Sequence, residues 1–296
     1  MDPIIETENL TKRYGSFAAV HDLNLQVRTG SICAFLGQNG AGKSTTLRML
    51  LGMSRPTSGS GRILGYRIDD ESESVAMRQR VAFVAEDKRL YDYMTVQQII
   101  RFTKSFFPKW RDGLERDLLG RFELPPSRKI RKLSKGMRTK LALLLAFARG
   151  SELLILDEPT EGLDPVATEE VLRIVVALAA EGASVFFSSH QIAEVDQIAD
   201  HVLMIHKGEL VLDAALDRIK DEYRHVQAVL RRSIDDRDFA IDGVERFEQH
   251  GATVSLIVSH NVDAVVDRAR QMNASNVDVA PLTLKEIFLE TVRSHG

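Results

Sequence analysis

Short apolar runs alternate with longer stretches of helical spacing through most of the chain. Each run is too short for a typical buried helix, and several are rich in Val, Ile or Phe, so we predict β-strands there. The expected strands are residues 23–27, which alternate apolar with polar, and residues 32–36, 81–85, 153–156 and 185–187. Strands that alternate with helices favour an α/β fold, with a mostly parallel sheet covered by helices.

A helical stretch interrupts this alternation. Thr95 and Gln98 form a capping-box pattern, which predicts a helix from there to about residue 107, where Pro108 ends it. A second helix is expected over residues 114–122, and a third begins near Ser134. We therefore expect a helical insert over about residues 87–150.

Beyond residue 212 the pattern changes. We expect a polar connecting helix over residues 214–223, strands over 226–230 and 253–258, and a helix over 261–272. Thr283 and Glu286 form another capping-box pattern, which opens a final helix. The sequence thus predicts two domains, residues 1–220 and a small α+β accessory domain over residues 221–296.

Composition excludes several classes of protein. The 296 residues include 39 basic and 42 acidic side chains, a net charge of -3, without the basic excess of nucleic-acid binders. Cys33 is the one cysteine, so no internal disulfide can form, which fits a reducing compartment. We see no secretory signal, and the longest apolar stretch, residues 141–148, is far short of the ~20 residues of a membrane span. If the protein acts at a membrane, we expect another chain to cross it.

The segment GQNGAGKS matches the G-x-x-x-x-G-K-[S/T] pattern, between a predicted strand and a predicted helix. Glycines let backbone N–H groups turn toward phosphate oxygens, and a helix N-terminus adds a favourable dipole. We expect Lys43 to bind the β- and γ-phosphates of ATP and Ser44 to bind Mg²⁺. The alternative is a glycine turn with a solvated lysine. The residues expected to contact the nucleotide here are Gly37, Gln38, Asn39, Gly40, Ala41, Gly42, Lys43, Ser44 and Thr45.

A second motif, DEP, follows the predicted strand over residues 153–156. We expect Asp157 to hold Mg²⁺, directly or through water. Glu158 would face the γ-phosphate and orient or deprotonate the attacking water, since positioning and charge neutralisation dominate phosphoryl transfer. Taken alone, the motif could also be an acidic helix cap or turn.

Together these motifs resemble the nucleotide-binding subunit of ATP-binding cassette (ABC) transporters, over residues 3 to about 220. The segment LSKGM, with Ser134 and Gly136, resembles the family signature LSGGQ, although Lys135 and Met137 depart from it. In the family, this segment caps the γ-phosphate of ATP held by the opposite subunit. The resemblance implies a P-loop NTPase core with an antiparallel β subdomain. It also implies a head-to-tail dimer, with a second copy or a homologous subunit, around two ATP molecules.

Further positions match the family. Tyr14 matches the aromatic residue that stacks on adenine, and His190 matches the switch histidine that touches the γ-phosphate. Residues 162–165 resemble the loop that contacts the partner subunit beside the catalytic carboxylate. The alternatives are a core or surface tyrosine and a structural histidine. The resemblance gives Lys43, Glu158 and His190 as the catalytic residues.

One departure concerns the metal site. The family usually has glutamine where this chain has Glu86, and that glutamine reaches Mg²⁺ and the attacking water and senses the membrane partner. Glutamate ligates Mg²⁺ more strongly because it is charged, but without the metal it repels the γ-phosphate. We expect Ser44, Asp157 and Glu86 to bind the metal. A glutamate here and a lysine in the signature both occur among bacterial exporters whose membrane subunits are separate chains.

Two surface features stand apart from these motifs. An aromatic cluster around the helical insert is either a groove for a short helix of a membrane partner or, as we favour for at least half of it, core packing. We interpret a basic cluster over residues 128–132 as a solvated face; the alternative is a surface that faces lipid headgroups. The aromatic cluster consists of Tyr91, Tyr93, Phe102, Phe106, Phe107 and Trp110.

Three functions are candidates for a chain with these motifs. The first is an ATPase that drives a transporter, an exporter by preference, in the cytoplasm at the inner face of the cell membrane and bound to a separate polytopic chain. The second is a soluble ABC-type ATPase acting on nucleic acid or ribosomes, although this chain has one cassette and no sustained heptads. The third, a regulator without turnover, conflicts with the joint presence of Lys43, Asp157, Glu158 and His190. We therefore expect ATP and Mg²⁺ as cofactors and no nucleic acid as partner.

Overall fold

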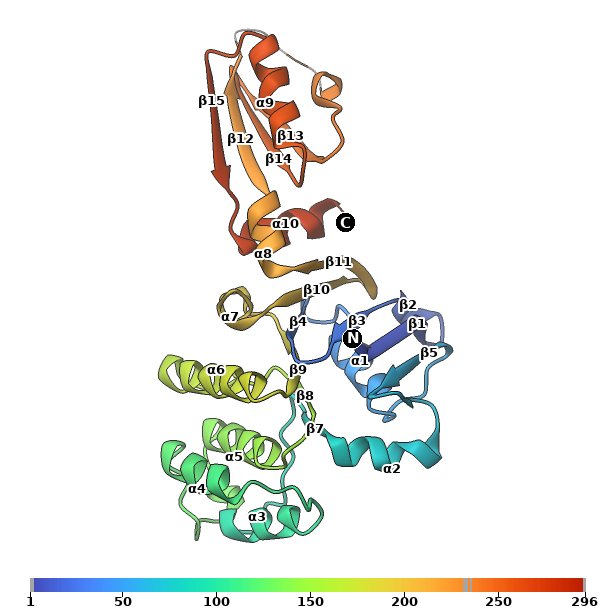
Figure 1. The fold of residues 1–296 in the computed structure, drawn as a ribbon, viewed down its shortest axis with the longest axis vertical. Helices are drawn as coiled ribbons and strands as arrows, with labels where there is room; N and C mark the ends of the chain where they lie inside the picture. The colour runs from blue at the N-terminus through green and yellow to red at the C-terminus, as the bar shows by residue number, and fades with distance from the viewer. Residues whose placement is uncertain (1–2, 231–233, 235, 295–296) are drawn as a thin grey trace. The chain divides into compact units, whose positions relative to one another are not determined.

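The computed structural model describes residues 3–230, 234 and 236–294. The chain divides into two compact units, Met1–Asp213 and Ala214–Gly296 (Figure 1). Within the described ranges, no helix combines the length and the apolar character needed to cross a membrane.

A six-stranded sheet forms the centre of the N-terminal unit, in the order β11-β10-β4-β9-β8-β7. Neighbours from β10 to β7 are parallel, and every residue of β4, β8 and β9 is buried, as parallel strands covered on both faces require. The four apolar runs expected as parallel strands are confirmed to within two residues at each end. The strands are β4 (Ile32–Leu36), β7 (Val81–Val84), β8 (Leu153–Asp157), β9 (Ser184–Ser189), β10 (His201–His206) and β11 (Glu209–Ala215).

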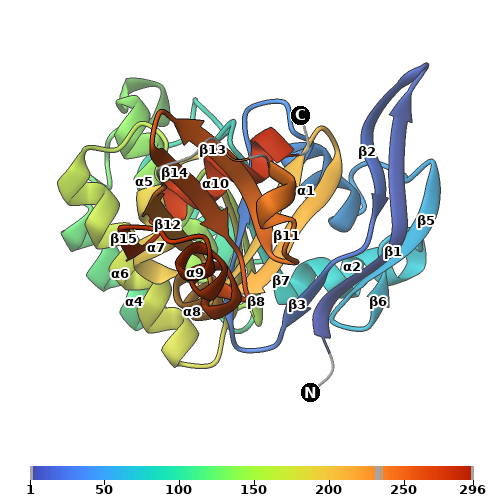
Figure 2. The same ribbon diagram turned by 90° about the horizontal axis from the view of Figure 1, so that it is seen from above.

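An antiparallel sheet lies on one side of this unit, with helices α4, α5 and α6 on the other (Figure 2). Its order is β2-β1-β5-β6, with β3 paired to β1. The continuous strand predicted over residues 23–27 is wrong, because β2 ends at Leu23 and β3 begins at Gln26. Thr7 fills this break, since its hydroxyl donates to the Leu23 carbonyl (2.8 Å) and accepts from the Leu25 N–H (3.0 Å). The strands are β1 (Pro3–Tyr14), β2 (Phe17–Leu23), β3 (Gln26–Arg28), β5 (Ser58–Ile63) and β6 (Tyr66–Arg67).

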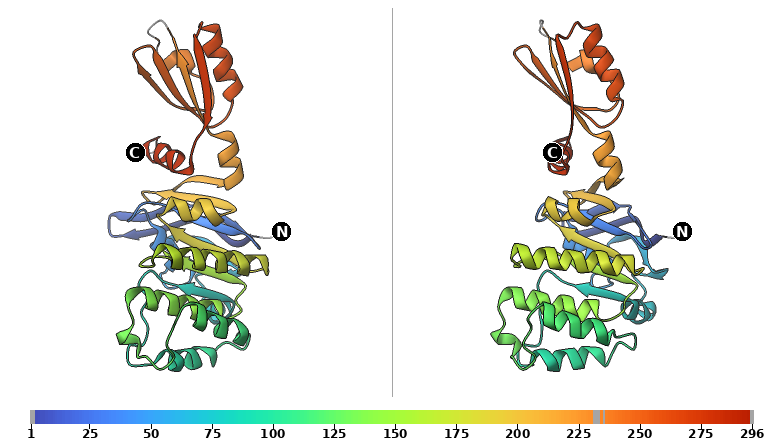
Figure 3. Two further views of the ribbon diagram at one scale, coloured as in Figure 1. Left: turned by 90° about the vertical axis from the view of Figure 1, so that its left-hand side faces the viewer. Right: turned by 60° about the vertical axis from the view of Figure 1, so that its left-hand side comes forward.

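The helices α3, α4 and α5 gather at one end of the N-terminal unit, beyond α6 (Figure 3). The predicted capping box is confirmed: the Gln98 N–H donates to Thr95 Oγ1 (3.2 Å), and the Thr95 N–H donates to Gln98 Oε1 (2.8 Å). That helix ends at Lys104 rather than near residue 107, because its last turn tightens into i→i−3 bonds such as Phe107 N–H to Lys104 O. The helices are α1 (Lys43–Leu50), α2 (Glu71–Arg80), α3 (Val96–Lys104), α4 (Asp112–Arg121), α5 (Lys135–Phe147), α6 (Pro165–Ala180), α7 (Ile192–Ile198) and the 3₁₀ turn η1 (Ile130–Lys132).

One hydrophobic core joins the two sheets of the N-terminal unit. The rings of Phe35 and Phe186, on neighbouring parallel strands, lie 5.4 Å apart between centroids. Leu10 and Leu23 of the antiparallel sheet belong to the same buried cluster. The loops at the ends of β4, β8 and β9 are therefore carried by elements that packing holds rigid.

The C-terminal unit is an antiparallel sheet in the order β13-β14-β12-β15, with α9 along one face (Figure 3). Val226, Leu256 and Val265 are fully buried between this helix and the sheet. The two predicted strands and the predicted helices are confirmed, whereas β13 and β15 were not indicated by the pattern. Thr283 caps the last helix as predicted, accepting from the Glu286 N–H at 3.3 Å. The elements are β12 (Arg224–Val229), β13 (Val244–His250), β14 (Thr253–Val258), β15 (Asn276–Pro281), α8 (Leu216–Glu222), α9 (Val262–Gln271), α10 (Leu284–Ser294) and the 3₁₀ turn η2 (Asp236–Phe239).

Candidate active site

The loop between β4 and α1 has glycine where no side chain fits. Gly42, the N-cap of α1, has a φ of 113°, and a Cβ there would lie 2.6 Å from the Ala19 carbonyl oxygen. A Cβ on Gly37 would lie 2.6 Å from the Ile205 carbonyl oxygen. The glycines let the loop pack against β2 and β10, and in the described part of the chain no side chain caps α1. The first turn of this helix thus keeps N–H groups for an anion.

Lys43, the first residue of α1, is buried against this loop, with 6% of its surface exposed. Its ammonium donates to the main-chain carbonyls of Gly37 (2.7 Å) and Gln38 (3.3 Å) and lies 3.5 Å from Oε1 of Glu158. A buried cation is stable only when it is paired or hydrogen-bonded, and these acceptors fulfil that need. The ammonium therefore stands where the loop meets the end of β8, within reach of an anion at the loop.

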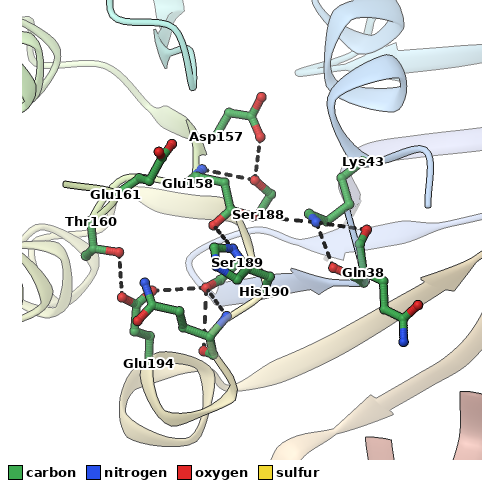
Figure 4. A network of polar contacts seen from close by, with 12 residues as sticks. Gln38, Lys43, Asp157, Glu158, Thr160, Glu161, Ser188, Ser189, His190 and Glu194 are labelled. Atoms are coloured by element: carbon green, nitrogen blue, oxygen red, sulfur yellow. Dashed lines mark hydrogen bonds and ion pairs between the residues drawn. The ribbon is translucent and has the colours of Figure 1, made fainter. Parts of the chain in front are cut away.

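Two carboxylates stand at the end of β8 (Figure 4). Asp157 is buried and accepts a hydrogen bond from the Ser188 hydroxyl (2.5 Å). Glu158 is buried as well, and its φ of 47° lies in the left-handed region, which costs a non-glycine residue about 1–3 kcal/mol. The Glu158 N–H donates to the same Ser188 hydroxyl (3.1 Å). One serine of β9 therefore orients both acidic residues.

The Glu158 carboxylate also meets His190, which follows β9 (Figure 4). Its Oε2 lies 2.9 Å from Nδ1 of His190. Because a carboxylate only accepts, Nδ1 carries the proton in this contact, and Nε2 is left for another partner. The His190 side chain is 45% exposed, while that of Glu158 is 7% exposed. A cation, a proton acceptor and an imidazole therefore lie together at one point, on Lys43, Glu158 and His190 respectively.

These side chains line a cavity of about 740 Å³. Gly37, Ala41 and Asp157, which were also expected at the site, are buried and are not among the lining residues. The expected residues that do line it are Tyr14, Gln38, Asn39, Gly40, Gly42, Lys43, Ser44, Thr45, Glu86, Glu158 and His190.

The segment that resembles the signature is not part of this cavity. Ser134 is exposed and caps α5, accepting from the Met137 N–H at 3.2 Å. The Lys135 ammonium pairs with Glu161 (2.6 Å), which lines the cavity. A Cβ on Gly136 would lie 3.1 Å from the Gly162 carbonyl oxygen. This segment is therefore held against the loop after Glu158 of its own chain, while Ser134 faces solvent.

Two aromatic rings stand at the tip of the β1–β2 hairpin. Tyr14 and Phe17 are register partners across a two-residue turn, and both line the cavity although they are 54% and 64% exposed. The Lys12 ammonium lies 5.3 Å from the centroid of the Tyr14 ring. Exposed rings at the edge of a cavity offer flat faces for a base. Sequence reasoning missed Phe17, and its position opposite Tyr14 across the turn is the signal that could have found it.

A buried polar network beside the cavity contains residues that sequence reasoning missed (Figure 4). Glu194 of α7 is buried and accepts from the hydroxyls of Thr160 (2.5 Å) and Ser189 (3.0 Å). Burial raises the pKa of Glu194 above its ordinary value, although the two hydroxyl bonds act in the opposite direction. The network ties the loop after Glu158 to the segment before His190. An acidic residue among the apolar positions of a short helix is the signal available in the sequence.

The aromatic cluster of the helical segment lies mostly on the surface. Expecting at least half of it in the core was wrong, because four of the six side chains are 42% to 68% exposed and their rings pack on one another. Trp110 is buried, and Phe107 is half-buried. A groove of about 440 Å³ is lined in part by Thr103 of α3, the helix that also carries Phe102. The exposed members are Tyr91, Tyr93, Phe102 and Phe106.

The oxygen donors of the site fit a metal ion that is bound together with a nucleotide. Among the residues that the structure describes, no cluster of three or more His, Cys, Asp or Glu side chains could hold a metal. Mg²⁺ usually takes one or two carboxylates, several waters and phosphate oxygens rather than a protein cage. Ser44 and Glu86 line the cavity, and Asp157 adjoins Glu158, so these donors suit such a complex.

Known proteins resemble this chain along its length. A family model described as ABC transporter matches residues 20–161. The bacitracin transport ATP-binding protein BcrA of Bacillus licheniformis is 33% identical, over 98% of this chain and 96% of that protein. The ABC transporter ATP-binding protein YtrB of Bacillus subtilis (strain 168) is 26% identical, over 97% of each. A solved structure of an ATP-binding subunit of an ABC transporter is 31% identical, with a TM-score of 0.68, and the match covers 74% of this chain and 92% of that one.

Proposed function

This chain belongs to the ABC transporter family as an ATP-binding and ATP-hydrolysing subunit, and from that premise we propose that it drives an exporter whose membrane-spanning part is a separate polytopic chain. The observation that carries the ATP-hydrolysis part of this proposal is the convergence of Lys43, Glu158 and His190 on one cavity. We infer export as the direction of transport from Glu86 and Lys135, which resemble residues of bacterial exporters with separate membrane subunits.

The nucleotide is proposed to lie between the β1–β2 hairpin and the N-terminus of α1. Tyr14 and Phe17 stack on the base at the outer edge of the cavity. N–H groups of the glycine loop surround the phosphates. The Lys43 ammonium exchanges the loop carbonyls of Gly37 and Gln38 for β- and γ-phosphate oxygens, which offer it charge-assisted hydrogen bonds.

Glu158 is proposed as the general base. Its carboxylate accepts a proton from water while the water oxygen bonds to the γ-phosphorus and the bond to the β–γ bridging oxygen breaks, which gives ADP and phosphate. His190 donates Nδ1–H to this carboxylate and keeps it oriented. When Nε2 of His190 also carries a proton, it can donate a hydrogen bond to a γ-phosphate oxygen. Lys43 offsets the charge on the phosphate oxygens.

Ser44, Asp157 and Glu86 are proposed to hold Mg²⁺. When bound with ATP, the metal neutralises phosphate charge. Ser188 keeps the Asp157 carboxylate oriented through its hydroxyl. Glu86 is exposed in the cavity wall, where it adds a negative charge that the usual glutamine of the family would not.

We propose a head-to-tail dimer because Ser134 and Gly136 lie outside the chain's own cavity. Ser134 stands exposed at the N-terminus of α5, and a helix N-terminus attracts anions. In the dimer, this end would close on the γ-phosphate held by the Lys43 loop of a second copy or of a homologous subunit.

The exposed aromatic cluster and the adjoining groove are proposed to receive the membrane chain. Exposed apolar patches mark interaction surfaces, and a groove of this kind suits a short helix. The protein would then act at the inner face of the cell membrane. We also propose residues 1–220 as the nucleotide-binding domain, with a helical subdomain over about 87–150, and residues 221–296 as an accessory domain.

Purification of the full chain from membranes tests this proposal. We expect a polytopic membrane chain to co-purify in a fixed ratio and its reading frame to lie beside this one. Recovery with ribosomes or nucleic acid, and without a membrane chain, would instead favour the alternative, a soluble ABC-type ATPase that acts on those partners.

A further inference from the structure

Lys88 reaches the main chain of Glu158 from a separate part of the fold. It follows β7 in the segment that also carries Glu86. Its ammonium donates a hydrogen bond to the main-chain carbonyl oxygen of Glu158 at 2.9 Å. The side chain is half-buried and lines the groove of about 440 Å³, but it is not among the residues that line the nucleotide cavity.

The carbonyl that Lys88 holds belongs to the residue with the strained backbone. Glu158 has a φ of 47°, which an L residue keeps only when its surroundings fix it. Ser188 holds the N–H side of this residue through its hydroxyl. On the carbonyl side, the Glu161 N–H donates at 3.3 Å, so the bond from Lys88 is the shorter of the two. Without the ammonium, the longer bond from Glu161 is what remains at this carbonyl among the residues that the structure describes.

Burial lowers the pKa of Lys88 below its ordinary value, and the carboxylates around it only partly offset this effect. The carboxylates of Glu161, Asp157 and Glu86 attract the ammonium, while Lys135 repels it. Arg89, the next residue, is 88% exposed and pairs with Asp87 instead. The chain therefore places two neighbouring cations in different roles, and Lys88 is the one that contacts the main chain of Glu158.

We propose that Lys88 is a positioning residue for ATP hydrolysis, which holds the main chain of Glu158 so that the carboxylate stays aimed at the cavity. The inference rests on the proposed role of Glu158 as general base. Because Lys88 lies outside the cavity wall, its loss reduces the rate of the chemical step and leaves nucleotide binding intact. A small displacement of a catalytic group is enough for a large loss of rate.

Steady-state ATP hydrolysis by the full chain tests this role with Lys88→Met, Lys88→Arg and the neighbouring control Arg89→Met. We expect Lys88→Met to lower kcat at least ~10-fold with KM for ATP changed less than about 2-fold. Lys88→Arg keeps a cationic donor and should recover most of kcat, and Arg89→Met should match the wild type. If Lys88→Met fails to fold in a thermal unfolding scan, Lys88→Gln, a shorter neutral donor, is expected to give an intermediate kcat.

Two results would overturn the inference. One is a wild-type kcat for the folded Lys88→Met or Lys88→Gln protein. The other is an equal loss of kcat in Arg89→Met, or no recovery in Lys88→Arg, because either would mean that the segment matters only for general structure. Glu158→Gln, measured in parallel, distinguishes a failure of the proposed base from a failure of the inference about Lys88. Turnover retained in Glu158→Gln would remove the proposed base. Turnover lost in Glu158→Gln and retained in Lys88→Met would remove only the positioning role of Lys88.

Discussion

The Nδ1 atom of His190 lies 2.9 Å from Oε2 of Glu158. The other oxygen of the same carboxylate faces the Lys43 ammonium at 3.5 Å. Both oxygens of the acidic group therefore have a partner, one at the start of α1 and one directly after β9. A carboxylate held at both oxygens keeps the orientation that a base for an attacking water needs.

His190→Ala removes one of these two contacts. We expect kcat for ATP hydrolysis to fall roughly 100-fold, because the carboxylate loses its orientation and the site loses an imidazole. KM for ATP should change by less than about 3-fold, since Lys43 and the glycine loop remain. His260→Ala in the C-terminal unit serves as the control. An unchanged kcat in His190→Ala would remove the histidine from the reaction.

Tyr14→Ala removes one of the two rings at the edge of the cavity. We expect KM for ATP to rise about 5- to 10-fold with kcat nearly unchanged, because a stacked base gains about 1–3 kcal/mol from an aromatic face. Tyr14→Phe should behave like the wild type, and Tyr93→Ala, an exposed ring outside the cavity, is the matched control. Equal effects of Tyr14→Ala and Tyr93→Ala would argue against base stacking at the hairpin.

Glu194→Gln should change how stability depends on pH. Burial raises the pKa of Glu194 above its ordinary value of 4.5, so the folded protein holds this proton more tightly than the unfolded chain. The stabilisation this provides is complete below pH 4.5 and is lost as pH rises through the raised pKa. Glutamine does not titrate. Urea unfolding across this range should therefore show a smaller loss of stability in Glu194→Gln than in the wild type.

The control for this comparison is Glu71→Gln, at an exposed position in the first turn of α2. It should follow the wild-type curve. If Glu194→Gln also follows that curve, the buried network does not contain a carboxyl group with a raised pKa.

Ser134→Arg tests whether the site is shared between two copies. The substitution should abolish hydrolysis although the Lys43 loop of the same chain is intact, because a bulky cation would block the partner's γ-phosphate. Lys43→Ala should be inactive as well. In a 1:1 mixture, half of the dimers contain both variants and one intact site each, so about a quarter of wild-type activity should return. A mixture without activity would count against a head-to-tail arrangement.

The sequence predicts the parallel sheet well because its strands are buried on both faces and appear as continuous apolar runs, as at Ile32–Leu36. The break between Leu23 and Gln26 could not be predicted, since it depends on the hydroxyl of Thr7, far away in the sequence. Similarly, β13 (Val244–His250) is half-buried along most of its length, so its residues do not alternate in a simple way.

At the site, local patterns identified the residues that act through the backbone or through fixed spacing, such as the glycine loop and the acidic pair after β8. Residues that depend on tertiary contacts were missed. Glu194 accepts hydrogen bonds from hydroxyl groups of two other segments. Lys88 donates a hydrogen bond to the main-chain carbonyl oxygen of Glu158. Phe17 reaches the cavity only because the hairpin pairs it with Tyr14.

Glu158 is the proposed base for the hydrolysis of ATP held between the glycine loop and Lys43. This role is measured as phosphate release by the purified full chain with Mg²⁺ and ATP, for the wild type and Glu158→Gln. ATP affinity and dimer formation are measured on the same samples. We predict that Glu158→Gln lowers turnover at least ~100-fold, keeps its affinity for ATP, and accumulates as an ATP-bound dimer. Turnover of Glu158→Gln at the wild-type rate would show that Glu158 is not the base.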